Sequence, residues 1–186
     1  LLEDIKRAAS EPLARNSAAS LWDIGDGVLC LEFHTKMNAI EPGVMEMIRT
    51  AISTVEERFK ALVIHNEGSN FSVGANLGLV LCAANIAGWE QLEQTVKDGQ
   101  QTYKALKYAP FPVVGAPAGM ALGGGCEVLL HCDALVAHAE SYMGLVEVGV
   151  GLVPAWGGCK ELLTRWSTNP KAPGGPMPAV SKAFET

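Results

Sequence analysis

A run of three glycines, Gly123 to Gly125, leads directly into an apolar segment, Cys126 to Cys132, that contains a single carboxylate, Glu127. Glycine adopts backbone dihedrals that other residues avoid, so the stretch Gly119 to Gly125 predicts a tight turn opening a buried helix. The free N–H groups at the start of such a helix favour an anion, or a carbonyl oxygen that becomes one. A turn without a ligand is the simpler explanation of three glycines alone. No Gly-Lys-Ser/Thr follows them, which excludes a phosphate loop.

A second carboxylate, Glu147, also lies among apolar residues and glycines. Burying a charge is costly unless it is paired, and a buried carboxyl group has a raised pKa that lets it carry a proton at neutral pH. A favourable position near a helix start could explain Glu127 on structural grounds alone. The two glutamates are therefore candidate proton-transfer groups that need further support.

Short apolar runs alternate with helical patterns along the chain, which predicts βαβ units and a parallel sheet, and so an α/β fold. We expect Asn66 to Gly74 to be a loop, and Gly25 to Gly27 to be a hairpin turn. The expected strands are residues 21–23, 28–34, 61–65, 111–116 and 134–137. The expected helices are residues 42–59, 76–87, 89–108 and 126–132.

Three regions are expected. Residues 1–19 predict an amphipathic helix and a polar linker from an upstream region, and residues 20–166 predict the core domain. Residues 167–186 form a truncated tail rich in proline and glycine, and Ser167 to Pro178 predicts a loop. Neither terminus carries the signals of a complete chain, so we expect a piece of a longer polypeptide. The stretch Leu77 to Ile86 is too apolar for a solvated helix, so we expect part of it to be exposed or disordered until another segment or subunit covers it.

Composition excludes several classes. Hydrophobic residues make up 48% of the 186 residues and charged residues 18%, which favours a buried globular domain over disorder. A net charge of −6 argues against a nucleic-acid partner, and no apolar run is long enough to span a membrane. The scattered cysteines and histidines predict no metal site. Free thiols are typical of a reducing compartment, so we expect a cytoplasmic protein. The five cysteines are Cys30, Cys82, Cys126, Cys132 and Cys159.

Taken together, four motifs resemble the crotonase (enoyl-CoA hydratase/isomerase) superfamily over Leu21 to Trp166. Gly119 to Glu127 looks like the family signature, and Phe71 to Asn76 is similar to its first oxyanion loop. Glu147, followed by Gly-Leu-Val-Pro and Gly-Gly, resembles the second catalytic stretch. Lys36 to Ala39 resembles an early acyl-CoA-contacting motif.

The resemblance implies a spiral of ββα units, here with the C-terminal helical segment missing. It implies that the backbone N–H groups of Ala75 and Gly124 form an oxyanion hole, and that Glu127 and Glu147 are catalytic. No metal and no cofactor are implied, except coenzyme A as part of the substrate. The implied substrate contacts are Lys36, Asn38, Ala39, Val73, Asn76 and Leu77.

Three positions depart from the family's usual pattern. Asn76 replaces an aspartate, Gly78 replaces a lysine that contacts CoA, and Ala155 stands where glycine is common. The motif order resembles the C-terminal hydratase domain of a fused 3-hydroxyacyl-CoA dehydrogenase, which implies a linked dehydrogenase domain and a homo-oligomer as a candidate assembly.

The first functional hypothesis is an enoyl-CoA hydratase of fatty-acid β-oxidation that adds water to a 2-trans-enoyl-CoA. The alternatives are an enoyl-CoA double-bond isomerase or other acyl-CoA enolate chemistry, and a non-catalytic acyl-CoA-binding domain. Fold alone does not choose among them.

Overall fold

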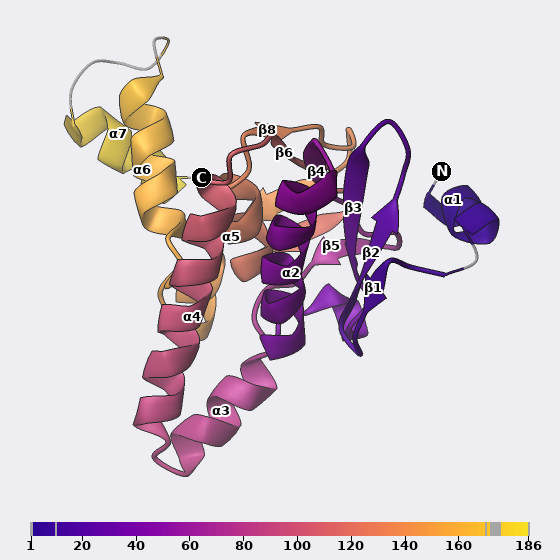
Figure 1. Cartoon of the computed structure of the whole chain (residues 1–186). Coiled ribbons are helices and arrows are strands. Elements are labelled where there is room, and N and C mark those ends of the chain that lie inside the picture. The colour runs from indigo at the N-terminus through magenta and orange to yellow at the C-terminus, as the bar shows by residue number, and fades with distance from the viewer. Residues whose placement is uncertain (1, 10, 170, 172–175, 186) are drawn as a thin grey trace.

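A mixed sheet with strand order β1-β2-β3-β4-β6-β8 forms the centre of the computed structural model, which describes residues 2–9, 11–169, 171 and 176–185 (Figure 1). The first three strands pair antiparallel and the others pair parallel. The strands are β1 (Ala14–Arg15), β2 (Ala19–Asp23), β3 (Val28–Phe33), β4 (Ala61–Ile64), β6 (Val113–Gly115) and β8 (Ala134–Leu135). The predicted α/β fold is confirmed.

A second, smaller parallel sheet has the order β5-β7-β9 and consists of Asn70–Ser72, Met120–Leu122 and Tyr142–Gly144. The prediction that residues 66–74 are only a loop is wrong at β5, and the predicted turn at 119–125 begins with β7. Each of these strands is three residues long, which is too short for the alternation that identifies a strand in a sequence. This small sheet carries the segments on which the candidate site is built.

Helices cover one face of the main sheet, where α2 and α4 pack side by side (Figure 1). Pro42 begins α2, a position at which its missing N–H costs nothing. The helices are α1 (Leu2–Ala9), α2 (Pro42–Arg58), α3 (Leu77–Asn85), α4 (Trp89–Lys107), α5 (Gly124–Leu130), α6 (Gly158–Thr168) and α7 (Pro176–Glu185), with short 3₁₀ helices η1 (Lys36–Asn38) and η2 (Glu147–Val150).

The hydrophobic core lies between the strands and the two packed helices. Leu31 and Ile64 of the sheet, Ile48 of α2 and Leu106 of α4 are almost fully excluded from solvent. Burying each such side chain contributes about 1.5–3 kcal/mol relative to leaving it exposed. This core fixes α2 and α4 on the sheet, so that α4 can serve as one wall of the site.

The amphipathic helix predicted near the N-terminus is α1, and it contacts the main sheet. Leu2 packs against Trp22 and Cys30. The Lys6 ammonium lies 2.6 Å from Oε1 of Glu32, whose other oxygen accepts a hydrogen bond from Nε1 of Trp22 at 3.0 Å. The boundaries proposed at residues 19 and 166 stay predictions.

The prediction of a loop from Ser167 to Pro178 is wrong at both ends. Helix α6 continues to Thr168, and α7 begins at Pro176. Both Pro176 and Pro178 lie in the first turn of α7, where a helix has no internal partner for the N–H that proline lacks. Proline therefore marked a helix start here. Part of the predicted loop, residues 170 and 172–175, lies outside the described residues.

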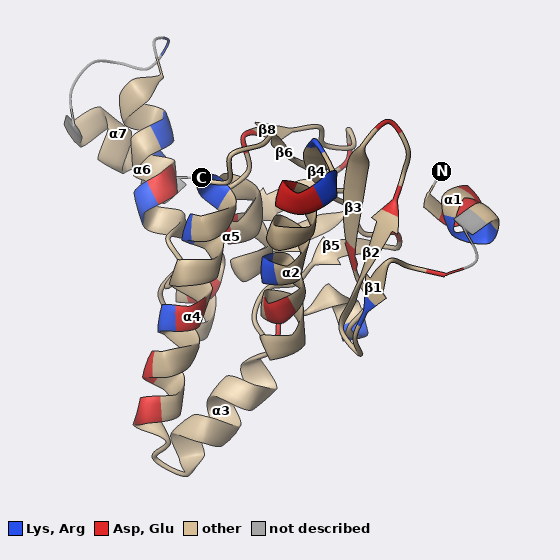
Figure 2. Ribbon diagram, in the orientation of Figure 1, with Lys and Arg blue, Asp and Glu red and all other residues tan. Residues whose placement is uncertain are grey.

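Helix α3 is exposed and carries no charge. None of its residues is buried, and Leu81 is 62% exposed. Figure 2 shows α3 without a charged residue, whereas α2 and α4 carry several. The expectation that part of Leu77 to Ile86 is exposed is confirmed. Within the described ranges, no helix combines the length and hydrophobicity needed to cross a membrane.

Candidate active site

Glu127 is held in a buried position at the start of α5. The turn before it depends on Gly123, whose φ of 53° lies in the left-handed region. The Glu127 side chain is nearly inaccessible, and its Oε1 accepts hydrogen bonds from the backbone N–H groups of Trp156 (3.0 Å) and Gly158 (2.8 Å). Burial raises the pKa of Glu127 to about 7, against the opposing effect of these donors. The group is therefore ready to exchange a proton near neutral pH.

Glu147 opens η2 and faces the same turn. A Cβ atom built on Gly123 would lie 3.2 Å from Oε1 of Glu147, so the carboxylate is next to the glycine run. Its Oε2 is enclosed and has no hydrogen-bond partner within the described part of the chain. Burial raises the pKa of Glu147. An enclosed carboxylate oxygen without a partner is available to a ligand or a water molecule.

Both carboxylates line one cavity of about 370 Å³, although 20 positions separate them in the sequence. Apolar residues from three segments form the remainder of its wall. These include Val73, Leu77, Val80, Leu92, Val96, Val146, Val150, Leu152 and Val153. Two proton-exchanging groups in an otherwise apolar cavity suit an elongated apolar ligand with one polar reacting centre.

The N–H groups of Ala75 and Gly124 lie beside this cavity. The Ile40 N–H donates to the Gly74 carbonyl, and the Asn76 N–H donates to the Ile40 carbonyl, in the β-bridge between Ile40 and Ala75. The Ala75 N–H is therefore directed away from Ile40. Gly124 is the first residue of α5, so its N–H has no acceptor inside the helix. Neither group donates a hydrogen bond to another described residue.

The two N–H groups are brought together by the close approach of two segments. A Cβ atom on Gly124 would lie 3.5 Å from the Ala75 nitrogen. Gly74 has a φ of 87°, and a Cβ there would lie 2.7 Å from the carbonyl oxygen of Leu122 and 3.0 Å from the Gly124 nitrogen. Only glycine at position 74 allows this close approach, which brings the neighbouring Ala75 next to Gly124.

Trp156 is a site residue that the motifs did not single out. It lines the cavity, and its ring lies between two glycines: a Cβ on Gly99 would be 2.2 Å from its Nε1, and a Cβ on Gly124 would be 2.6 Å from its Cζ3. Tyr103 stacks edge-on against it at 5.6 Å and donates a hydrogen bond of 3.0 Å to the Gly124 carbonyl. The available signal in the sequence was a tryptophan flanked by Pro154-Ala155 and Gly157-Gly158.

The predicted substrate contacts separate into two groups. Val73 and Leu77 line the main cavity, and Asn76 lines a neighbouring one while its side chain caps α3 through the Gly78 N–H. Lys36, Asn38 and Ala39 lie at η1 and line none of the three described cavities. The Asn38 side chain donates to the carbonyl of Asn70 at 2.9 Å, which holds η1 against β5.

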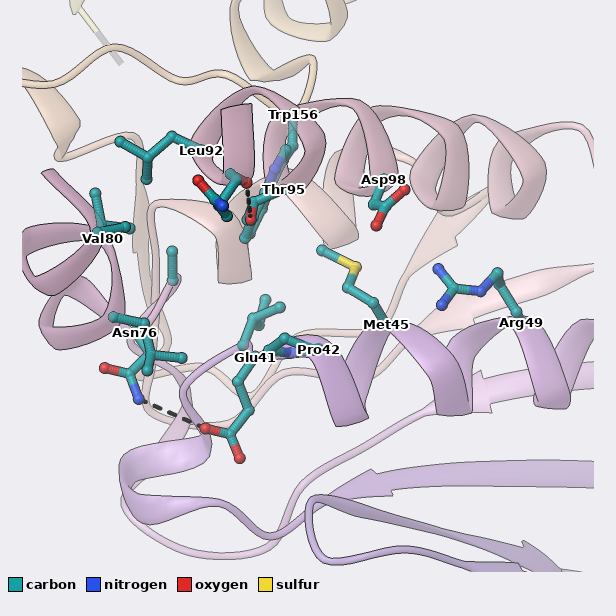
Figure 3. Close-up of a pocket in the computed structure, with 15 residues that line it drawn as sticks. Glu41, Pro42, Met45, Arg49, Asn76, Val80, Leu92, Thr95, Asp98 and Trp156 are labelled. Carbon is teal, nitrogen blue, oxygen red and sulfur yellow. Dashed lines mark hydrogen bonds between the residues drawn. The ribbon is translucent and has the colours of Figure 1, made fainter. Parts of the chain in front are cut away.

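The neighbouring cavity is smaller, about 140 Å³, and lies between α2, α3 and α4 (Figure 3). Val80, Leu92, Thr95 and Trp156 stand on one side of it, facing Met45 from α2 (Figure 3). Five residues line both cavities: Ala75, Val80, Leu92, Thr95 and Trp156. The two cavities are therefore adjacent chambers, and the smaller has room for about six carbon atoms by comparison with benzene in a 150 Å³ cavity.

A third cavity, of about 390 Å³, lies on the other side of Trp156 and is bordered by Lys104, His131 and Lys160. Nδ1 of His131 is 2.7 Å from the Glu127 carbonyl oxygen. Glu161, buried behind this cavity, pairs with Lys107 and Lys160. No group of three or more potential metal ligands occurs among the described residues.

Comparison with known proteins identifies the family to which the chain is similar. The family model described as "Enoyl-CoA hydratase/isomerase" matches residues 23–169. A Bacillus subtilis protein named "Probable 3-hydroxyacyl-CoA dehydrogenase" is 44% identical over 94% of the chain and 22% of its own length. A Rickettsia prowazekii "Putative fatty acid oxidation complex trifunctional enzyme" is 42% identical over 73% of the chain and 19% of its own length. The chain thus spans about a fifth of these relatives.

Solved structures agree on the fold. An enoyl-CoA hydratase from Polaromonas sp. JS666 superposes with a TM-score of 0.76 at 26% identity, covering 82% of this chain and 60% of that one. A Geobacillus kaustophilus protein named "Enoyl-CoA hydrates" has a TM-score of 0.77 at 20% identity, covering 92% and 61%. The site and fold define an α/β domain with two enclosed carboxylates at one largely apolar cavity. The chain belongs to the enoyl-CoA hydratase/isomerase (crotonase) family.

Proposed function

We propose that the domain is an enoyl-CoA hydratase that adds water across the double bond of a 2-trans-enoyl-CoA. The observation that carries this proposal is the convergence of Glu127 and Glu147 on one cavity, next to the Ala75 and Gly124 N–H groups that no described residue accepts. A hydratase needs both a place for negative charge on the thioester oxygen and two groups that manage the protons of one water.

The thioester carbonyl would accept hydrogen bonds from the Ala75 and Gly124 N–H groups. These donors would polarise the carbonyl and stabilise the enolate that forms when water attacks. Removing one donor of this kind typically costs about 2.7–4 kcal/mol of transition-state stabilisation. The absence of a competing acceptor for either N–H among the described residues supports this role.

The two carboxyl groups would divide the work on the water. Glu127 has one oxygen fixed by Trp156 and Gly158, which sets its position, and its other oxygen would bind the water. The water would give one proton to Glu127 as its oxygen bonds to Cβ, and protonated Glu147 would give a proton to Cα. A proton passing from Glu127 to Glu147 would then restore both groups. The enclosed Oε2 of Glu147, which has no partner among the described residues, supports its place next to the reacting atoms. This chemistry requires no metal or redox cofactor, only coenzyme A as part of the substrate.

Double-bond isomerisation is the second candidate, and the different environments of the two carboxylates favour considering it. Glu147 alone could move a proton between two carbons of the acyl chain, with Glu127 needed only for the water in the hydratase reaction. A non-catalytic acyl-CoA-binding domain would not need two enclosed carboxylates with raised pKa values.

The test is the loss of the conjugated thioester absorbance of crotonyl-CoA, measured with the full-length protein and its Glu127→Gln and Glu147→Gln variants. Both variants should lose hydration, because an amide of the same shape cannot exchange the proton. Hydration that survives in Glu147→Gln would show that the proton donor is misassigned. A Glu127→Gln variant that still moves the double bond would show that both activities are present. Glu46→Gln, on an exposed position of α2, is the control.

The names of the relatives support a wider setting. A hydratase product is a 3-hydroxyacyl-CoA, which is the substrate that the name of the Bacillus subtilis relative specifies. We therefore place the reaction in fatty-acid β-oxidation, with a dehydrogenase domain linked to this one in the full-length protein. The homo-oligomer and the cytoplasmic location stay predictions.

A further inference from the structure

Trp156 contacts both the Glu127 carboxylate and Gly124, the first through its backbone and the second through its ring. Its backbone N–H donates to Oε1 of Glu127 at 3.0 Å. Its ring lies against Gly124, where a Cβ atom would come within 2.6 Å of Cζ3.

The ring cannot move from Gly124 toward α4. On its other edge it contacts α4 at Gly99, where a Cβ atom would lie 2.2 Å from Nε1. Gly99 is buried and lies in the middle of a 19-residue helix, where glycine is less favourable than alanine. The close fit of the indole explains why this position needs a glycine.

Tyr103, one turn further along α4, completes the support. Its ring packs edge-on against Trp156 with centroids 5.6 Å apart, and its hydroxyl donates to the Gly124 carbonyl at 3.0 Å. Gly124 is thus fixed through its carbonyl by Tyr103 and through its Cα by Trp156. The N–H of the same residue lies beside the cavity and has no acceptor among the described residues.

We propose that Trp156 is a positioning residue for the proposed hydration, because its ring sets the place of the Gly124 N–H while its main chain sets the place of the Glu127 carboxylate. This inference rests on the proposed function of the site. Trp156 acts through these two groups and does not exchange protons or charge itself. Its loss should therefore displace donor and carboxylate together.

The test uses the full-length protein with Trp156→Ala, Trp156→Phe and Gly99→Ala. Trp156→Ala should lower kcat for crotonyl-CoA about 100-fold, since a displacement of about 1 Å can cost that much, with a smaller change in KM. Trp156→Phe keeps an aromatic ring against Gly124 and should recover most of the rate. Gly99→Ala never touches substrate, yet should lower kcat about tenfold by pushing the indole out of its slot.

A pH profile separates positioning from a general loss of stability. If the segment of Trp156 and Gly158 shifts, Glu127 loses donors that favour its charged form, so the acid limb of kcat should move to higher pH in Trp156→Ala and return in Trp156→Phe. A merely destabilised enzyme would keep the wild-type limb. None of the variants replaces an ionisable group that faces Glu127: these groups are Glu147 from η2, Tyr103 from α4, Cys126 from α5, His131 just after α5, and Cys159 from α6.

The double variant Gly99→Ala/Trp156→Ala tests whether Gly99→Ala lowers kcat by displacing the indole. With the indole absent, the alanine at position 99 has nothing to displace, so the double variant should be no slower than Trp156→Ala. Fully additive losses, or a wild-type kcat and acid limb in Trp156→Ala, would overturn the inference. Trp89→Ala is the control, because Trp89 is 64% exposed and lines no described cavity. A wild-type protein that does not hydrate crotonyl-CoA would instead overturn the proposed function, and this inference with it.

Discussion

Adding one methyl group at Gly124 should disable the enzyme while leaving the fold intact. In Gly124→Ala the new Cβ would lie 2.6 Å from Cζ3 and 2.9 Å from Cε3 of Trp156. Carbon atoms in contact prefer about 3.5–4.0 Å, so the start of α5 has to move by about 1 Å. The indole cannot move away toward α4, because Gly99 already lies against its other edge.

A movement of about 1 Å in a positioned donor can cost about 100-fold in rate. Overpacking a core by this amount costs about 1–3 kcal/mol of stability, which a cooperative domain of this size survives. We therefore expect kcat for crotonyl-CoA to fall about 100-fold in Gly124→Ala, with urea unfolding that remains cooperative. A β-branched residue at this position should abolish turnover.

Gly149→Ala is the matched control, since a Cβ there meets no atom within 4 Å and its φ is not in the left-handed region. It should retain wild-type kcat. If Gly124→Ala is as active as Gly149→Ala, the oxyanion donor is not the Gly124 N–H, and the assignment of the site is wrong.

Three further predictions follow from burial and cavity shape. The pKa of Glu127 rises from 4.5 to about 7 on folding, so the folded state binds more protons than the unfolded state in this interval. The free energy of unfolding should therefore fall by up to about 3 kcal/mol between pH 4.5 and pH 7 relative to Glu127→Gln. Parallel curves of unfolding free energy against pH for the two proteins would refute this prediction. Ala83 lines only the smaller chamber, so Ala83→Phe should lower kcat/KM for 2-decenoyl-CoA about tenfold or more, at about 0.8 kcal/mol per excluded methylene, and leave kcat/KM for crotonyl-CoA unchanged. Ala84 lines no described cavity, so Ala84→Phe should change kcat/KM for neither substrate. Leu81→Ser on exposed α3 should change the free energy of unfolding by less than about 0.5 kcal/mol, whereas Leu62→Ala in β4 should cost about 2–5 kcal/mol; a large loss at position 81 would show that α3 is covered.

The sequence allowed five strands of the main sheet and the long helices to be predicted, because each has a clear pattern. The two-residue strand β1 lies in the segment predicted to be a polar linker, and was missed. Helix α2 begins at a proline and repeats apolar residues at helical spacing, and β4 is a continuous apolar run. The strands of the second sheet escaped prediction because three residues carry no period. Helix α7 escaped because Pro176 and Pro178 indicate a loop unless one knows that they occupy a first turn.

The two glutamates were predictable because a carboxylate in an apolar segment needs an explanation. Their shared cavity could not be read from residues alone, since it depends on how η2 folds back on α5. Trp156 was missed for a related reason. Its importance lies in its fit between Gly99 and Gly124, which are 57 and 32 positions away, and no local pattern records a fit of that kind.

The contact between Gly74 and Leu122 also has a consequence for folding. Strands β5, β7 and β9 contribute three residues each and are separated by stretches of about 50 and 20 residues, so their pairing must close long loops for little immediate gain in contacts. Helices α2 and α4 depend on local order and can form earlier. We therefore expect the chain to recover its helical signal and its buried core before Ala75 meets Gly124. The recovery of turnover during refolding should lag behind the recovery of the circular dichroism signal. Catalytic activity would then report on the last step of folding.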